Sequence, residues 1–299
     1  MNACPVCSTT RTYEEASLDG ATLYRCADCA HRFSRLAPTD SRLETYADSY
    51  YDDEHANWFR NPNTPLFDWI AARIRERHDR PSILDVGCGH GALLTHLQQS
   101  IDGASLTGID PFSRSGVAGI EFHEAGLEDF HPEHPYDVVT SLATIEHIED
   151  AASFVGHLRR VCAPGGTLIT MTLNDDSVLY RAARALRRIG LHGAHRRLYD
   201  PHHVNHFSVR SLSRLLEQSG LGDQTVLRHN IPFRAVDIPP GPWPVRAIHR
   251  LGVTGCFLIG KATGQTYLQT VVCRTPGRPQ PAVDPARNRP EPAPSHAPS

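Results

Sequence analysis

The residues with the clearest chemical pattern are four cysteines near the start of the chain. Cys4 and Cys7 form one Cys-x2-Cys pair, Cys26 and Cys29 form a second, and eighteen residues separate the pairs. Thiolate sulfur is a preferred zinc ligand, and this spacing lets two turns enclose one tetrahedral ion. We expect a structural zinc, since four cysteines leave no open position for a reactive water. Disulfides are the alternative, disfavoured because the sequence shows no export signal.

The second chemical pattern is a glycine-rich loop followed by an acid. Residues 83–86 have the pattern of a buried strand, and a helical run begins at Ala92; between them stand Gly87, Gly89 and Gly91. Glycines permit a tight turn and close approach of the backbone to a nucleotide-like ligand. Asp110 ends the next expected strand about 20 residues farther on, where a carboxylate can accept ribose hydroxyls. The pattern predicts a cofactor site; the alternative is a glycine turn without a ligand.

The charge of Asp85, at the end of the first expected strand, selects the kind of cofactor. A carboxylate there repels a pyrophosphate and attracts a ligand that carries an ammonium and a sulfonium group. S-adenosylmethionine carries both of these charges. We therefore expect S-adenosylmethionine and not a dinucleotide.

Three histidines are candidates for a catalytic base. A methyl group on sulfonium is already activated, so transfer mainly needs an aligned nucleophile and the exclusion of water, and a hydroxyl acceptor also needs a base. His147 follows an expected strand on the side to which the methyl group should point. His203 and His206 lie in a later segment that we expect to cover the pocket. We expect His147 to be the base, with His203 and His206 as alternatives.

These residues need a framework of alternating strands and helices. Short β-branched runs alternate with helical patterns, as parallel βαβ units require, at 82–86, 105–109, 136–141 and 166–172. Helical patterns cover 66–74, 178–197 and 211–220, and a final strand at 266–274 is expected to close the sheet as an antiparallel edge. The sequence predicts an α/β, doubly wound, Rossmann-like domain.

The chain resembles the class I S-adenosylmethionine-dependent methyltransferases. The resemblance covers about 80–274 and rests on the glycine loop, the strand and exit at 136–148, the Pro-Gly-Gly turn at 162–169, and the segments 172–174 and 203–208. The last two are similar to the subgroup that modifies quinone precursors, sugars and other small metabolites. The resemblance implies a seven-stranded sheet whose last strand is antiparallel.

The resemblance also implies roles for individual residues. The methionine part of the cofactor falls to Asp85, Gly87, Gly89 and Gly91, and the ribose to Asp110. Glycine stands in 124–129 where many members place an acid, so adenine contact falls to the backbone around Leu127. Members that bind a divalent ion through Glu-x-x-Glu-His have glutamate where this chain has Ala143, so we expect no catalytic magnesium.

Composition and spacing divide the chain into four parts. They are a zinc-ribbon module at 1–36, a helical connector and active-site cap at 37–80, the catalytic domain at 81–274 and a disordered Pro-rich tail at 275–299. The net charge of −3 gives no general attraction to nucleic acid. No apolar run is long enough to cross a membrane, and the first residues lack a signal-peptide pattern, so we expect a cytoplasmic protein.

The sequence favours methyl transfer to a small-molecule acceptor, most simply a hydroxyl of a metabolite, quinone precursor or sugar. One alternative is a ribosomal RNA base methyltransferase, with the zinc ribbon recognising RNA and the arginines of 181–197 binding phosphates. Another is a non-catalytic subunit that binds cofactor and activates a partner. We expect no membrane partner and no nucleic acid, and allow for a homodimer.

Overall fold

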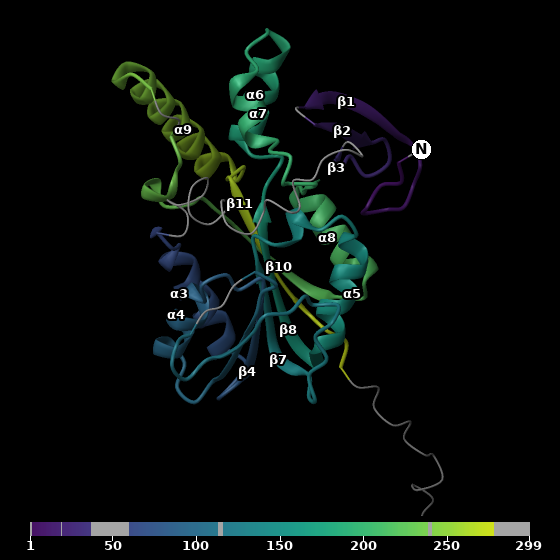
Figure 1. Cartoon of the computed structure of the whole chain (residues 1–299), viewed down its shortest axis with the longest axis vertical. Helices are drawn as coiled ribbons and strands as arrows, with labels where there is room; N and C mark the ends of the chain where they lie inside the picture. The colour runs from purple at the N-terminus through teal and green to yellow at the C-terminus, as the bar shows by residue number, and fades with distance from the viewer. Residues whose placement is uncertain (1, 19, 37–59, 113–115, 239–240, 278–299) are drawn as a thin grey trace, which may run out of the picture.

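The computed structural model describes most of the 299-residue chain, over residues 2–18, 20–36, 60–112, 116–238 and 241–277. Most of the expected connector, 37–59, and most of the expected tail, 278–299, lie outside the described residues. Figure 1 shows a central sheet with helices on both faces, a helical lobe above one end of the sheet, and a small N-terminal sheet beside that lobe.

The central sheet has seven strands. Its order in space is β10 (Gly222–His229), β11 (Leu268–Arg274), β8 (Cys162–Leu173), β7 (Tyr136–Leu142), β4 (Ser82–Val86), β5 (Ser105–Ile109) and β6 (Glu121–His123). The five strands from β8 to β6 are parallel, and β11 is antiparallel to both of its neighbours. The predicted α/β class, the seven strands and the antiparallel last strand are confirmed.

The position of the last strand differs from the prediction. β11 was expected at the edge of the sheet, but it lies inside, between β8 and β10. The edge is β10, a strand that the sequence pattern did not identify. Its side chains are exposed or half-buried throughout, so β10 lacks the apolar run of a buried strand.

Helices cover both faces of the sheet because its strands are apolar on both sides. Four of them are α3 (Thr64–Arg75), α4 (Ala92–Ser100), α5 (Ala151–Val161) and α8 (Val209–Gln218). Successive side chains of a strand point to opposite faces. Ile83 therefore packs with α3 and α4, whereas Leu84 packs with α5 and α8. Figure 1 shows these two pairs on opposite sides of the sheet.

The N-terminal sheet is completed by a strand from a distant part of the chain. It contains β1 (Thr12–Leu18), β2 (Ala21–Cys26), β3 (Arg32–Leu36) and β9 (Asn205–His206). β9 comes from the segment that was expected to cover the pocket, and it pairs antiparallel with β3. Leu23 and Phe33 of this sheet are fully buried against later parts of the chain. The N-terminal sheet is thus joined to later parts of the described chain by backbone pairing and by a shared core.

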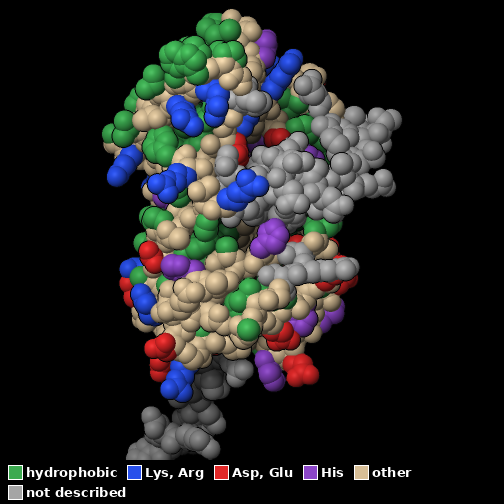
Figure 2. Space-filling view, turned by 60° about the vertical axis from the view of Figure 1, so that its left-hand side comes forward, with side chains coloured by type: hydrophobic (Ala, Val, Ile, Leu, Met, Phe, Trp, Pro, Cys, Tyr) green, Lys and Arg blue, Asp and Glu red, His purple; other side chains and the backbone are tan. Residues whose placement is uncertain are grey.

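The upper lobe consists of α6 (Val178–Arg188), α7 (Gly193–Leu198) and α9 (Trp243–Thr263). The prediction of a single helix at 178–197 is wrong, because the structure has two helices in this range. Gly190, at φ +86°, ends the first of them. α9 exposes large apolar side chains, including Ile248 and Leu251, and Figure 2 shows hydrophobic side chains gathered at this end of the molecule. Among the described helices, none has the length and apolar content needed to cross a membrane.

Candidate active site

A cavity of about 600 Å³ opens at the carboxyl ends of β4, β5 and β7. Ligands of open parallel α/β sheets bind at this end of the strands. Of the predicted site residues, the cavity wall brings together Asp85, Gly87, Gly89, Asp110, His147 and His203. Gly91 lies just behind the wall, at the start of α4, and Leu127 and His206 are also outside the lining.

The glycine loop has a backbone that only glycine adopts without strain. Gly87, Gly89 and Gly91 have φ angles of +72°, +51° and +74°, which L side chains rarely adopt. The amide of Gly87 donates to the carbonyl of Ile109 at 2.9 Å, so the loop folds back over β5. A Cβ atom on Gly87 would lie 2.3 Å from Oγ1 of Thr144. The loop is therefore shaped both by its own backbone and by the exit of β7.

Asp110 is a fixed acceptor at the end of β5. Its Oδ2 accepts from the amide of Gly89 at 3.0 Å and its Oδ1 accepts from the amide of Phe112 at 2.9 Å. The residue is only 4% exposed, and it lines the cavity. A carboxylate has about four lone-pair sites, so each oxygen can accept a further bond from a ribose hydroxyl.

Asp85 lies in a different environment, at the end of β4. Its Oδ1 accepts from the Thr140 hydroxyl at 2.7 Å, and the side chain is buried. Burial raises the pKa of Asp85 to about 7; the Thr140 bond opposes this rise and the neighbouring Asp110 charge adds to it. A cationic ligand beside Asp85 favours the ionised carboxyl group. The site therefore suits the ammonium group of S-adenosylmethionine.

The residue expected at the adenine faces the core. The side chain of Leu127 is 4% exposed and belongs to the core on the α5 side of the sheet. Its carbonyl accepts from the Arg160 guanidinium at 3.4 Å. The neighbour Glu128 lines the cavity instead. Of the acids in 124–129, Glu128 is thus the one that reaches the cavity wall.

His147 stands where the chain leaves β7, in a short 3-10 helix, η2 (Ile145–His147). Its Nδ1 lies 2.9 Å from the carbonyl of His202. A carbonyl only accepts, so Nδ1 carries the proton in the neutral ring and Nε2 is the basic nitrogen. The His203 ring meets His147 edge-on, at 4.7 Å between centroids.

A cluster that the sequence reasoning did not assemble surrounds His147. The ligand atoms of Glu146, His147 and His203 lie within 4.8 Å of one another. A carboxylate and two imidazoles are ligands for a divalent ion. In the Glu-x-x-Glu-His pattern of the resemblance, the ligand missing from this chain falls at Ala143. In the structure, the third ligand group beside Glu146 and His147 is His203, more than 50 residues downstream. The similarity of 203–208 to small-molecule enzymes was the one signal that could have indicated it.

Glu146 is the buried member of this cluster. It is 2% exposed and its Oε2 accepts from the Thr172 hydroxyl at 2.8 Å. Burial raises the pKa of Glu146 to about 7, against the opposing effect of its hydrogen bonds. Its backbone carbonyl accepts from the amide of Val204, which holds His203 and Val204 at the cavity wall.

His206 lies away from the cavity, in β9. It is 3% exposed and its Nε2 lies 3.1 Å from the Ser34 hydroxyl. Burial lowers the pKa of His206 to about 3. In this position the side chain links the N-terminal sheet to the catalytic domain.

The four N-terminal cysteines meet in one cluster. Cys4 Sγ lies 3.5 Å from Cys29 Sγ, and Cys7 Sγ lies 3.6 Å from the sulfurs of Cys26 and Cys29. A tetrahedral zinc with bonds of about 2.3 Å requires sulfurs roughly 3.8 Å apart. The Asp28 and Cys29 amides each donate to the Cys26 sulfur at 3.4 Å, as backbone amides do at metal-binding cysteine turns. The residues present therefore fit a zinc ion.

The comparisons with known proteins agree with this geometry. The family model described as "Methyltransferase domain" matches residues 27–226. The ubiquinone biosynthesis O-methyltransferase of Sodalis glossinidius is 31% identical over 161 residues, which cover 49% of this chain and 64% of that protein. The protein of the same name from Aromatoleum aromaticum is 30% identical over 171 residues, covering 53% and 70%. The chain thus spans somewhat less than two thirds of the Sodalis protein.

Solved structures share the fold at low identity. The 1,6-didemethyltoxoflavin-N1-methyltransferase of Burkholderia thailandensis superposes with a TM-score of 0.50 at 13% identity, over 84% of this chain and 97% of that one. The plantazolicin methyltransferase BpumL superposes with a TM-score of 0.50 at 17% identity, over 80% and 92%. The family match spans more than half of the chain, and the glycine loop and both acids lie within it. The chain therefore belongs to the methyltransferase domain family.

Proposed function

We propose that this protein transfers a methyl group from S-adenosylmethionine to a hydroxyl group of a small-molecule acceptor. The observation that carries the proposal is one cavity in which the glycine loop, Asp85 and Asp110 lie together with His147. The two relatives named above are O-methyltransferases of ubiquinone biosynthesis, which supports an oxygen acceptor of the quinone-precursor type.

Each side chain of the cavity has a role that follows from its environment. Asp110 accepts the ribose hydroxyls, and Asp85 faces the ammonium group. His147 takes the acceptor proton at Nε2, because its Nδ1 donates to the His202 carbonyl. When bound, S-adenosylmethionine supplies a methyl group already activated by the sulfonium charge. The protein therefore has to align the hydroxyl, remove its proton and keep water out.

The test uses the purified full chain with zinc bound. S-adenosylmethionine carrying a labelled methyl group is added to a metabolite extract and to the same extract after nuclease treatment. We expect label in small molecules, unchanged by the nuclease and abolished by Asp110→Ala, whereas exposed Asp102→Ala remains active. Label that disappears with nuclease supports the RNA alternative, and cofactor binding without any transfer supports the partner-subunit alternative.

Three further expectations belong to this proposal. Of the cap expected at 37–80, the structure describes residues 60–80, and there α3 contributes Leu66 and Phe67 to the cavity wall, which supports a cap formed by this part. We also retain the homodimer and the cytoplasmic location as predictions. Light scattering of the purified chain at several concentrations tests the dimer, and a clean monomer mass at all of them contradicts it.

A further inference from the structure

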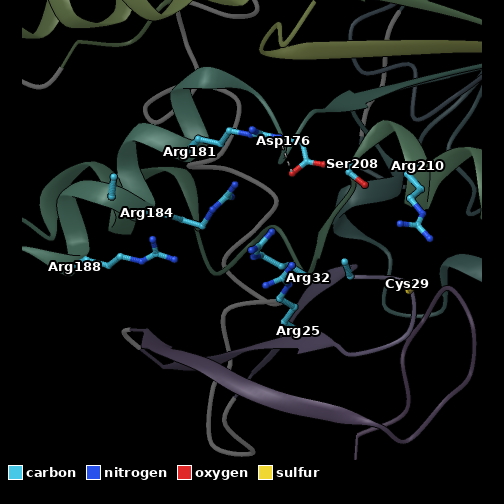
Figure 3. Close-up of a pocket in the computed structure, with 11 residues that line it drawn as sticks. Arg25, Cys29, Arg32, Asp176, Arg181, Arg184, Arg188, Ser208 and Arg210 are labelled. Carbon is cyan, nitrogen blue, oxygen red and sulfur yellow. Dashed lines mark ion pairs between the residues drawn. The ribbon is translucent and has the colours of Figure 1, made fainter.

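A second cavity lies between the N-terminal sheet and the catalytic domain. Its volume is about 370 Å³, and its wall comes from β2, β3, α6 and the start of α8. Six of its lining residues are arginines: Arg25, Arg32, Arg181, Arg184, Arg188 and Arg210. Figure 3 shows these side chains reaching the same space from three parts of the fold. We call this cavity the arginine pocket.

The acids around the arginine pocket neutralise only part of its charge. Arg32 pairs with Glu15 and Asp175, both at 2.6 Å, and Arg184 shares Asp175 at 2.9 Å. Asp176 lies 3.9 Å from Arg181. Among the described residues, three carboxylates thus pair with these six guanidinium groups, which leaves three positive charges.

The surplus charge falls on specific side chains. Within the described part of the chain, no ion pair is formed by Arg25, Arg188 or Arg210. The Nε atom of Arg25 is buried and has no hydrogen-bond partner there. A buried donor of this kind costs free energy unless a ligand or water accepts its proton.

The backbone adds to the positive potential. Ser208 lines the pocket and caps the N-terminus of α8, a ten-residue helix with no acid in its first turn. The N-terminal end of a helix dipole carries a partial positive charge. The arginines and the helix end therefore act in the same direction, toward an anion.

The arginine pocket is separate from the cavity of about 600 Å³ that contains the glycine loop, which we call the methyl-transfer cavity. β3 joins the two, because Arg32 lines the first and Leu36 lines the second. Four residues of extended strand span about 13 Å. Phe33, Asn205 and His206 of the paired strands β3 and β9 are buried and line neither cavity. A ligand in the arginine pocket therefore makes contacts that the cofactor does not.

We propose that the arginine pocket binds the diphosphate group of a small ligand. Guanidinium groups form paired hydrogen bonds with phosphate oxygens, and three unneutralised charges match a diphosphate better than a single carboxylate. The volume lies within the roughly 300–1,000 Å³ of small-molecule sites, so there is room for more than an inorganic anion. Either free diphosphate or a nucleoside diphosphate presents this chemistry.

The experiment uses calorimetry on the zinc-loaded full chain, with S-adenosylhomocysteine present at saturation so that the methyl-transfer cavity is filled. Inorganic diphosphate and uridine diphosphate are titrated separately. We expect one saturable site, weakened about ten- to hundredfold by Arg188→Ala and by Arg210→Ala, because each removes a charged hydrogen bond. Tighter binding of uridine diphosphate identifies the nucleotide as the source, and equal affinities identify the diphosphate group alone.

The matched control is Arg246→Ala, which removes the same charge from an exposed position on α9. Zinc content and the melting temperature are measured for each variant, and both should equal the wild-type values because Arg188 and Arg210 are exposed. No saturable heat, or an equal loss in Arg246→Ala, would overturn the proposal. A single-stranded RNA that binds more tightly than uridine diphosphate and is lost in the same two variants would overturn the small-ligand assignment. Because the methyl-transfer cavity stays filled with S-adenosylhomocysteine, none of these results depends on methyl transfer.

Discussion

Asp85 and Asp110, the two aspartates of the methyl-transfer cavity, show how the same type of side chain acquires different properties. Asp110 accepts two backbone amides, which fix its carboxylate. Asp85 has one hydroxyl donor and is buried, so its pKa rises to about 7. The first acid is held in one orientation by these two amides. The second changes charge close to neutral pH and responds to a cation.

Asp85 should make the stability of the ligand-free protein depend on pH. Its folded pKa is above the unfolded value near 3.8, so the folded state holds a proton that the unfolded state has lost, and stability falls as pH rises from about 4 to 7. Asp85→Asn cannot titrate. We expect its unfolding free energy, relative to wild type, to grow by a few kcal/mol over this window, at about 1.4 kcal/mol per pKa unit. Denaturant titrations at pH 4, 5.5 and 7 measure it, and parallel curves contradict it.

His147 carries the second prediction at this scale. We expect His147→Ala to lower turnover by about 10² to 10⁴ and to leave cofactor affinity unchanged, because a base acts on the acceptor and not on the cofactor. Turnover in the wild type should fall at acidic pH, where the imidazole is protonated. His203→Ala, His206→Ala and exposed His131→Ala are measured alongside. If His203→Ala lowers turnover more than His147→Ala and changes the fall of turnover at acidic pH, the base is His203. If turnover strictly requires added Mg²⁺, the cluster of Glu146, His147 and His203 is a metal site.

At the scale of elements, the cofactor site depends on a loop that has no room for side chains. The loop connects β4 to α4. Thr144, just after β7, packs against it so closely that Gly87 has no room for a Cβ atom. Left-handed φ angles at three glycines allow this path. The loop can therefore lie against a ligand at backbone distance.

Gly87→Ala should damage this element in two ways. The left-handed conformation costs about 1–2 kcal/mol for a residue with a Cβ atom, and that atom would overlap Thr144. We expect a lower melting temperature together with a cofactor affinity reduced tenfold or more. Gly252→Ala is the matched control, because Gly252 lies inside α9 with open space around it and should stabilise the helix by about 0.5–1 kcal/mol. Equal behaviour of the two variants would show that the loop tolerates a side chain.

At the scale of the whole molecule, the N-terminal sheet is tied to the cavity that it borders. β3 pairs with β9, and Arg32 reaches Asp175 beyond β8. Burial alone would raise the pKa of Asp175, but Arg184 and Arg32 outweigh it and lower that pKa. The amide of Val204 in turn bonds to Glu146. A change in the zinc module can therefore reach the cavity through the 203–206 segment.

Removal of zinc tests this connection. Elemental analysis should give one zinc per wild-type chain and none for Cys26→Ser, since four ligands are needed and the metal holds the two cysteine pairs together. Hydrogen exchange should then show lost protection in β1–β3 and at 203–206, with β4–β8 still protected and turnover reduced. Metal-free protein that keeps its N-terminal protection and binds cofactor, yet transfers no methyl group, would contradict a structural role.

The sequence by itself determined the features that depend on neighbouring residues. The glycine loop, the acids at the strand ends and the two cysteine pairs could all be predicted from the sequence. The conformation of a turn, and the distance over which two nearby side chains can share a ligand, are set within a few residues. Strands β4, β5, β7 and β8 were found for the same reason, since each includes a short run that contains β-branched and other apolar residues.

Tertiary structure alone decided which distant segments meet. It placed β11 between β8 and β10, joined β9 to the N-terminal sheet, brought His203 to Glu146 and buried His206. It also assembled the arginine pocket from β2, β3, α6 and α8. Such contacts depend on how all the apolar faces are buried at once, and that free energy belongs to the complete packing and not to any local spacing.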